Sequence, residues 1–148
     1  MQDPMTPTPM EQELLRREEI PEVDPAITRA LALLREDERP TVPIEMIDPD
    51  PAKYPIFRIR PNTTAIGDDI KKRILVNRKT ATNDQLLASY LAHEQEHVKR
   101  WGTPSHYDEM GPYQREFEVL SRLGYKDKDY MRALEARAKD RREAKDRR

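Results

Sequence analysis

One segment of this 148-residue chain has the residue pattern of a helix, with a recognisable capping motif at its start and a glycine at its end. The rest of the fold must pack around this helix. The segment reads TNDQLLASYLAHEQEHVKRWG and covers residues 82–102. Thr82 and Gln85 have the spacing of a capping box, in which each side chain satisfies a backbone amide of the other residue. Gly102 is the expected stop at the far end. Apolar residues recur between these bounds at helical spacing, which predicts an amphipathic helix with one buried face.

Two of the three histidines in the chain lie on this helix. His93 and His97 stand four residues apart, and Glu94 directly follows the first. Positions four apart share one helix face, about 6 Å apart along the axis, so both imidazoles can reach one cation. All three side chains extend the apolar face, where a carboxylate is costly without a cation or donor nearby. The chain has no cysteine, so a metal here must be held by His, Asp and Glu.

Two histidines alone hold a metal poorly, and Glu116 is the third ligand that the sequence favours. It follows His97 after eighteen intervening residues, on a second predicted helix that opens at Pro112 and ends at Gly124. Glu116 falls inside the apolar arc of that helix, whereas Glu118 falls opposite it. A carboxylate held among apolar residues is stabilised by a cation, and one negative ligand suits the His₂Glu set of catalytic zinc.

Two alternatives to this assignment remain open. Glu116 could instead pair with Arg115 or Arg122 on its own helix. His106 could be the third ligand, but it stands nine residues after His97. The three-histidine zinc peptidases place their third histidine six residues after the second.

The remaining chain predicts an α+β fold with a small sheet. Pro25 opens a helix that Pro40 ends. Segments 41–47, 54–60 and 73–77 are expected to be extended, and 49–51 and 61–69 to be turns or loops. We divide the chain into a disordered acidic segment over 1–22 with a possible short helix at 10–19, a folded domain over 23–125, and a charged helical tail over 126–148. The tail has almost no apolar stripe after Leu134, so it is expected to be solvated and to fray.

Charge and hydropathy limit which classes of partner the chain can bind and where in the cell it is expected. Charged residues make up 37% of the chain and hydrophobic residues 36%, and the last 23 residues are predominantly basic. A basic tail can bind nucleic acid, but acidic residues interleave closely here, which favours a solvated helix. No apolar run approaches the roughly 18 residues of a membrane span, and the start lacks the pattern of a secretory signal. A cytoplasmic protein without membrane contact is expected.

With the His-Glu-x-x-His motif and Glu116 downstream, the sequence resembles the gluzincins, and among them the small ImmA/IrrE-like peptidases. The resemblance covers residues 24–125. It implies a zincin-like domain with a short mixed sheet, a Zn²⁺ ion held by His93, His97 and Glu116, and Glu94 as general base. It also implies a peptide or protein substrate that adds beside an edge strand, for which 73–77 is the candidate.

Around Glu116 the chain reads REFEVL, which departs from the fuller acidic–alanine signature of the family. A residue that stabilises the developing oxyanion is also expected from the resemblance. His106, Tyr107, Tyr113 and Arg115 are near enough in sequence to serve, and the sequence does not choose among them.

A different class of function stays open beside the peptidase. The metal could stabilise a non-catalytic binding or regulatory module, with His106 or Asp108 closing the site as a fourth ligand. Such a module could associate with nucleic acid through the basic tail.

Overall fold

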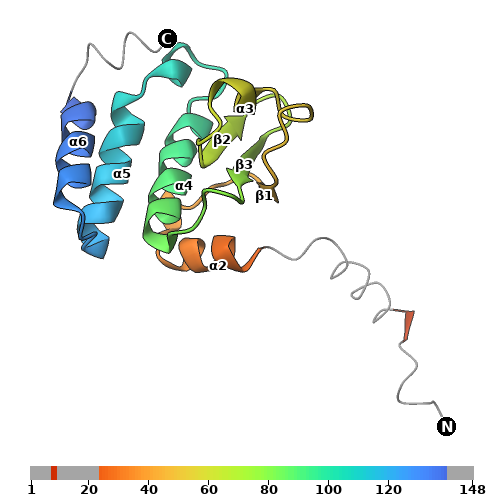
Figure 1. The fold of residues 1–148 in the computed structure, drawn as a ribbon, viewed down its shortest axis with the longest axis horizontal. Helices are drawn as coiled ribbons and strands as arrows, with labels where there is room; N and C mark the ends of the chain where they lie inside the picture. Colours follow the sequence, from red (N-terminus) through yellow and green to blue (C-terminus); the bar gives the residue numbers. More distant parts are fainter. Residues whose placement is uncertain (1–7, 10–23, 140–148) are drawn as a thin grey trace.

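The computed structural model describes residues 8–9 and 24–139 (Figure 1). The predicted disorder of 1–22 and helix at 10–19 therefore fall largely or wholly outside the described residues, as does the end of the charged tail, 140–148. The elements in chain order are α2 (Pro25–Ala32), η1 (Glu36–Glu38), β1 (Ile44–Ile47), α3 (Ile56–Ile59), β2 (Ala65–Asp68), β3 (Arg73–Asn77), α4 (Asp84–Val98), η2 (Pro104–Tyr107), α5 (Met110–Leu123) and α6 (Lys128–Lys139).

The three strands form one mixed sheet, and the helices lie mostly to one side of it. The strand order is β1-β3-β2, with β1 parallel and β2 antiparallel to β3. Figure 1 shows α4 beside the sheet, α5 next to α4, and α6 beyond α5. This arrangement confirms the predicted α+β fold class with a small mixed sheet.

The sheet corrects two sequence-based assignments. Residues 73–77 form a strand as predicted, but β3 is the central strand and cannot be the edge at which a substrate adds. The edge strand beside α4 is β2, inside the segment 61–69 that was expected to be a loop. Gly and Asp are disfavoured in strands, so residue propensities did not predict β2. The strand forms because each of its four residues pairs with β3 in an antiparallel ladder.

The segment 54–60 is not extended either. It contains α3, a single helical turn that begins after Pro55. Its alternation of apolar and polar residues resembled a strand, but Phe57 is the only one of its residues that is buried. A seven-residue run is too short for periodicity alone to separate a turn of helix from a strand.

Helix α4 forms where predicted, with a different cap. The Asn83 side chain accepts the hydrogen bond from the backbone N–H of Leu86 at 3.0 Å, so Asn83, not Thr82, is the N-cap. The helix ends at Val98, and Gly102 follows with a φ of 82° that suits glycine. The start of α5 lies at Met110 rather than at Pro112, while Gly124 ends it with a φ of 70° as expected.

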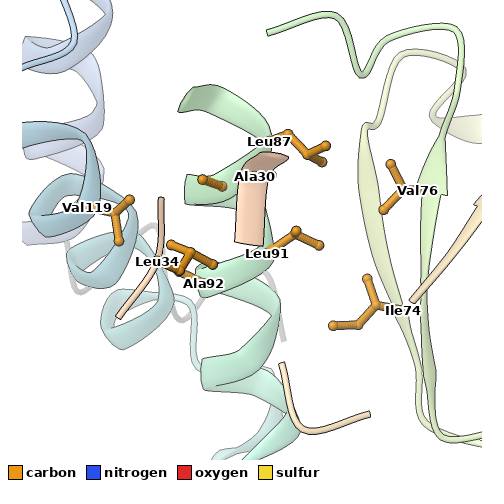
Figure 2. Close-up of a cluster of buried hydrophobic side chains, with 9 residues drawn as sticks. Ala30, Leu34, Ile74, Val76, Leu87, Leu91, Ala92 and Val119 are labelled. Carbon is orange, nitrogen blue, oxygen red and sulfur yellow. The ribbon is translucent and has the colours of Figure 1, made fainter. Parts of the chain in front are cut away.

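The main core lies between α4 and the sheet (Figure 2). Leu87 and Leu91 of α4 face Ile74 and Val76 of β3, and all four are buried almost completely. Burying side chains of this size stabilises the fold by about 1.5–3 kcal/mol each. The remaining buried residues of this cluster are Ala30, Leu34, Ala88, Ala92 and Val119. The core fixes α4 against the sheet just before the turns that carry the histidines.

The tail is more ordered than its composition indicates. Leu134 and Ala138 of α6 are buried in a second cluster together with Tyr113 and Leu120 of α5. Beyond Leu134 the helix is largely solvated as predicted, with Ala136, Arg137 and Lys139 exposed, and Ala138 one turn on is the exception. No helix of the described part of the chain combines the length and apolar character that crossing a membrane requires.

Candidate metal centre

The two histidines of α4 lie side by side at the edge of the core. His93 is 8% exposed and His97 is 9% exposed, and their ring centroids are 5.1 Å apart. The helical spacing predicted this common face, and the packing of the preceding turns against β3 holds it in place. Two buried imidazoles that face one another in this way are suited to share a cation.

The third member of the group is Glu109, at the N-cap position of α5. Its Oε2 atom lies 3.0 Å from Nε2 of His93, and its Oε1 atom lies 3.0 Å from Nε2 of His97. One ligand atom from each of the three residues falls within 4.8 Å of the others. Two ligands of a tetrahedral zinc at about 2.0–2.1 Å lie roughly 3.3 Å apart. The 3.0 Å contacts of the Glu109 oxygens with the two Nε2 atoms are close to that separation.

The bonding of Glu109 supports this fit. Its Oε2 atom is buried and has no hydrogen-bond partner, although Nε2 of His93 is only 3.0 Å away. The misalignment leaves this buried oxygen without a hydrogen bond, and attraction to the two histidines is what stabilises its charge. A cation between the oxygen and the ring nitrogens would satisfy both.

Glu116 is buried as predicted, with 5% exposure, but it lies on the other side of the His93 ring. Its Oε1 atom is 2.5 Å from Nδ1 of His93, and it is not part of the three-residue group. The two atoms are close, but their geometry is not that of a hydrogen bond, so Nδ1 of His93 has no hydrogen-bond partner. The residues grouped around one point are thus His93, His97 and Glu109, and the ligand role of Glu116 stays a prediction. The arrangement places Glu116 where a carboxylate orients a metal-binding imidazole.

The outer nitrogen of His97 is held by the backbone. Nδ1 of His97 lies 2.9 Å from the carbonyl oxygen of His106, which can only accept. The neutral His97 ring must therefore donate from Nδ1, which leaves Nε2 free of hydrogen and able to bind a metal.

The ring of His106 is not among the grouped ligands. It stacks on Tyr107 with 4.5 Å between centroids, and its Nδ1 lies 3.9 Å from Asp69. The alternative in which His106 supplies the third ligand is therefore not supported by this arrangement.

The electrostatics of the group follow from its burial and its carboxylates. Burial lowers the pKa of His93, but Glu109 and Glu116 outweigh it and raise that pKa to about 10. Burial also opposes the charge on His97, whose pKa is nevertheless raised, chiefly by Glu109. The pKa of Glu109 is held far below its usual range by the two histidines, despite its burial. The carboxylates of the metal-free group thus favour the protonated form of both histidines, and a bound metal ion would replace those protons.

Glu94 lies beside this group in a cleft of about 210 Å³. Burial raises the pKa of its carboxyl group, against the lowering effect of His93 and His97. None of the described residues donates a hydrogen bond to its carboxylate. The cleft is lined by Glu94, His97, Trp101, His106, Tyr107, Glu109, by Ile56, Arg60 and Thr63, and by Ala65, Ile66 and Gly67 of β2.

The other residues considered from the sequence are more distant from the chemistry. Tyr113 packs edge-on against the His93 ring, with 5.1 Å between centroids, and is buried. Arg115 binds Glu96 at 3.0 Å. Of these candidates for stabilising an oxyanion, His106 and Tyr107 alone line the cleft.

Glu109 was not among the ligands predicted from the sequence. Helical periodicity places only residues within a helix, and α5 was expected to begin at Pro112, which left Glu109 in a loop. The helix opens at Met110, so Glu109 stands at its entrance, twelve residues after His97. The available signal was an acidic pair, Asp108 and Glu109, one residue before the glycine–proline pair at 111–112.

Comparison of the chain with protein-family models, with curated proteins and with solved structures finds no match.

Proposed function

We propose that this chain is a zinc-dependent peptidase, in which His93, His97 and Glu109 hold the metal and Glu94 is the general base. The observation that carries the proposal is the convergence of three ligand atoms within 4.8 Å beside a cleft that also contains Glu94. The resemblance of the motif to gluzincins points to the same reaction. In this proposal the third ligand is Glu109 rather than Glu116, which was predicted from the sequence.

The number of ligands favours catalysis over a purely structural metal. Structural zinc sites are closed by four protein ligands, whereas catalytic sites have three and keep one position open. Among the described residues, no fourth His, Asp or Glu joins the group of three. The side chain of Asp108, one candidate for closing the site, accepts a hydrogen bond from the backbone of Met110 at 3.0 Å.

The residues around the site have separate tasks in the proposed reaction. Bound zinc would lower the pKa of a water molecule toward about 7 and polarise the substrate carbonyl. Glu94 accepts the proton of the attacking water and passes it to the leaving amine. Its raised pKa brings it nearer to neutral pH, where a base of this kind works best. Glu116 and the carbonyl of His106 keep the two imidazoles oriented.

A peptide substrate has a place to bind beside the site. Strand β2 is an edge of the sheet, and three of its residues, Ala65, Ile66 and Gly67, line the cleft. An extended peptide that adds to this edge would form backbone hydrogen bonds with β2 while its carbonyl faces Glu94. This proposal replaces 73–77 by β2 as the strand that aligns the substrate.

The function is tested with the full chain and a library of unstructured peptides, with cleavage followed by mass spectrometry. We expect cleavage that a chelator abolishes and added zinc restores, and that the Glu94→Gln variant lacks. A zinc-loaded chain that cleaves no peptide in the library would contradict the peptidase proposal, and the same chain tests the metal site separately by its zinc content.

A further inference from the structure

Strand β2 approaches the proposed general base most closely at Gly67. A Cβ atom placed on Gly67 would lie 3.1 Å from Oε2 of Glu94 and 3.3 Å from Cζ2 of Trp101. Both separations are shorter than ordinary van der Waals contact. Any side chain at this position would therefore have to displace the carboxylate or the indole ring.

The backbone conformation does not explain why a glycine stands here. The glycines with positive φ among the described residues are Gly102 and Gly124, so Gly67 adopts a conformation open to other residues. Glycine also weakens a strand relative to residues with a side chain. The close approach of Glu94 and Trp101 is the feature that distinguishes this position.

The strand itself has little room to yield. Gly67 pairs with Ile74 of the central strand, and Ile74 is fully buried in the main core. On the opposite face of β2, Ile66 packs into a cluster with Ile47, Phe57 and Leu75. Because the strand is held on both faces, a new methyl group at position 67 would move Glu94 or Trp101 by a few tenths of an ångström.

Glu94 depends on this wall for its position. Since no described residue donates a hydrogen bond to its carboxylate, packing sets where the oxygens lie. A Cβ atom on Gly67 would lie within 3.3 Å of both Oε2 of Glu94 and the Trp101 ring, so the Gly67 backbone and the Trp101 ring together form the wall near this oxygen.

We propose that Gly67 is a positioning residue that fixes the Glu94 carboxylate against β2 at the distance the proton transfer requires. The inference rests on the proposed peptidase function. Small misplacements of a reacting group slow a reaction strongly: a shift near 1 Å lowers the rate by about 10²-fold. A shift of a few tenths of an ångström in Glu94 is therefore expected to lower kcat by about tenfold.

The test compares Gly67→Ala with the unaltered chain in zinc affinity, KM and kcat. We expect unchanged zinc affinity, because Gly67 touches none of the three ligands, and a kcat about tenfold lower with KM changed much less. Ile70→Ala, at a position that is 88% exposed three residues further along, is the control and should leave all three quantities unchanged. An unchanged kcat in Gly67→Ala overturns the proposal.

A double-variant cycle shows whether Gly67 acts through Glu94. In a Glu94→Gln background, where the base is already absent, Gly67→Ala should lower the residual rate no further. An equal fold-loss in both backgrounds would mean that Gly67 acts on the substrate at the strand edge, which also overturns the proposal. If Gly67→Ala does not fold, Trp101→Phe removes the other part of the wall and should lower kcat at unchanged zinc affinity; an unchanged kcat there overturns the proposal.

Different results would contradict the role of Gly67 and the proposed peptidase function. An unaltered chain without peptidase activity contradicts the function, whereas an active chain that tolerates Gly67→Ala contradicts the inference alone. Trp101 is the single tryptophan of the chain, so its one indole N–H signal in NMR spectra reports the contact directly. That signal should shift in Gly67→Ala and stay in place in Ile70→Ala.

Discussion

The Oε1 atom of Glu116 lies 2.5 Å from Nδ1 of His93, across the ring from the Nε2 atom that faces Glu109. One imidazole therefore stands between two carboxylates with different tasks. Glu109 shares its oxygens between two histidines, whereas the close contact of Glu116 with a histidine is with His93. This geometry separates a residue that would bind the metal from one that would orient a ligand.

The first prediction compares the two carboxylates. Glu116→Ala should weaken zinc binding by about 10–100-fold, the usual effect of losing a residue that orients a metal ligand. Glu109→Ala removes a ligand and should weaken binding further. Titration of zinc against a competing chelator ranks the variants. Glu118→Ala, with a side chain that is 63% exposed, is the control and should change stability by no more than about 0.5 kcal/mol.

The reverse ranking would restore the ligand set predicted from the sequence. If Glu116→Ala loses zinc while Glu109→Ala keeps it, Glu116 is the third ligand. In that case the contact between Glu109 and the two histidines belongs only to the metal-free state.

The second prediction concerns Glu94. Glu94→Gln should bind zinc as tightly as the unaltered chain, because Glu94 is outside the three-residue group, and should lose hydrolysis by about 10²-fold or more. Zinc titration and peptide cleavage on the same preparation check both parts. Loss of zinc together with activity would make Glu94 a structural part of the site.

The third prediction concerns His106. The hydrogen bond from His97 goes to the backbone carbonyl of His106, and that carbonyl survives substitution. His106→Ala should therefore retain zinc, with a lower kcat only if the ring contacts the substrate in the cleft. A chelator titration decides this, and release of zinc from His106→Ala would point to a site with three histidines.

The fourth prediction concerns pH. The pKa of His93 is about 10 in the metal-free chain, since Glu109 and Glu116 outweigh its burial, so the ring carries a proton at neutral pH. Zinc binds the neutral ring, and binding must release that proton. The apparent zinc affinity should rise with pH, by about tenfold per pH unit for each proton released, and level off above the pKa of His93. Calorimetry in buffers with different ionisation enthalpies measures the released protons, and binding without release would contradict the ligand assignment.

The same pKa has a consequence for the metal-free chain. A pKa that is raised on folding gives stability that is fully present below the unfolded value, 6.5, and is lost as pH rises through about 10. Melting temperatures measured with chelator should therefore decline across this interval. His93→Ala removes the raised pKa and should lessen that decline.

The sequence predicted the helical half of the site better than the rest. His93, Glu94 and His97 are related by fixed helical geometry, so their common face could be read from their spacing. The burial of Glu116 followed from the same rule. Glu109 could not be found in this way, because its approach to the histidines depends on how residues 99–108 fold between two helices.

The sheet shows the same limit. Residues 73–77 were predicted to be extended from an alternation of apolar and polar residues, and they form β3, whose last four residues are all buried. Strand β2 contains Gly67 and Asp68, which disfavour strands when taken alone, and it forms through its pairing with β3. Which strand lies at the edge is a property of the assembled sheet, so the sequence assigned that place to the wrong segment.

The central claim is that His93, His97 and Glu109 hold one zinc ion per chain. Its most direct test is elemental analysis of the full chain, purified without chelator and dialysed, beside the His93→Ala/His97→Ala double variant. The account predicts about one equivalent of zinc in the unaltered chain and almost none in the double variant. A chain that holds no zinc and cannot be reloaded, or a double variant that holds as much as the unaltered chain, would contradict it.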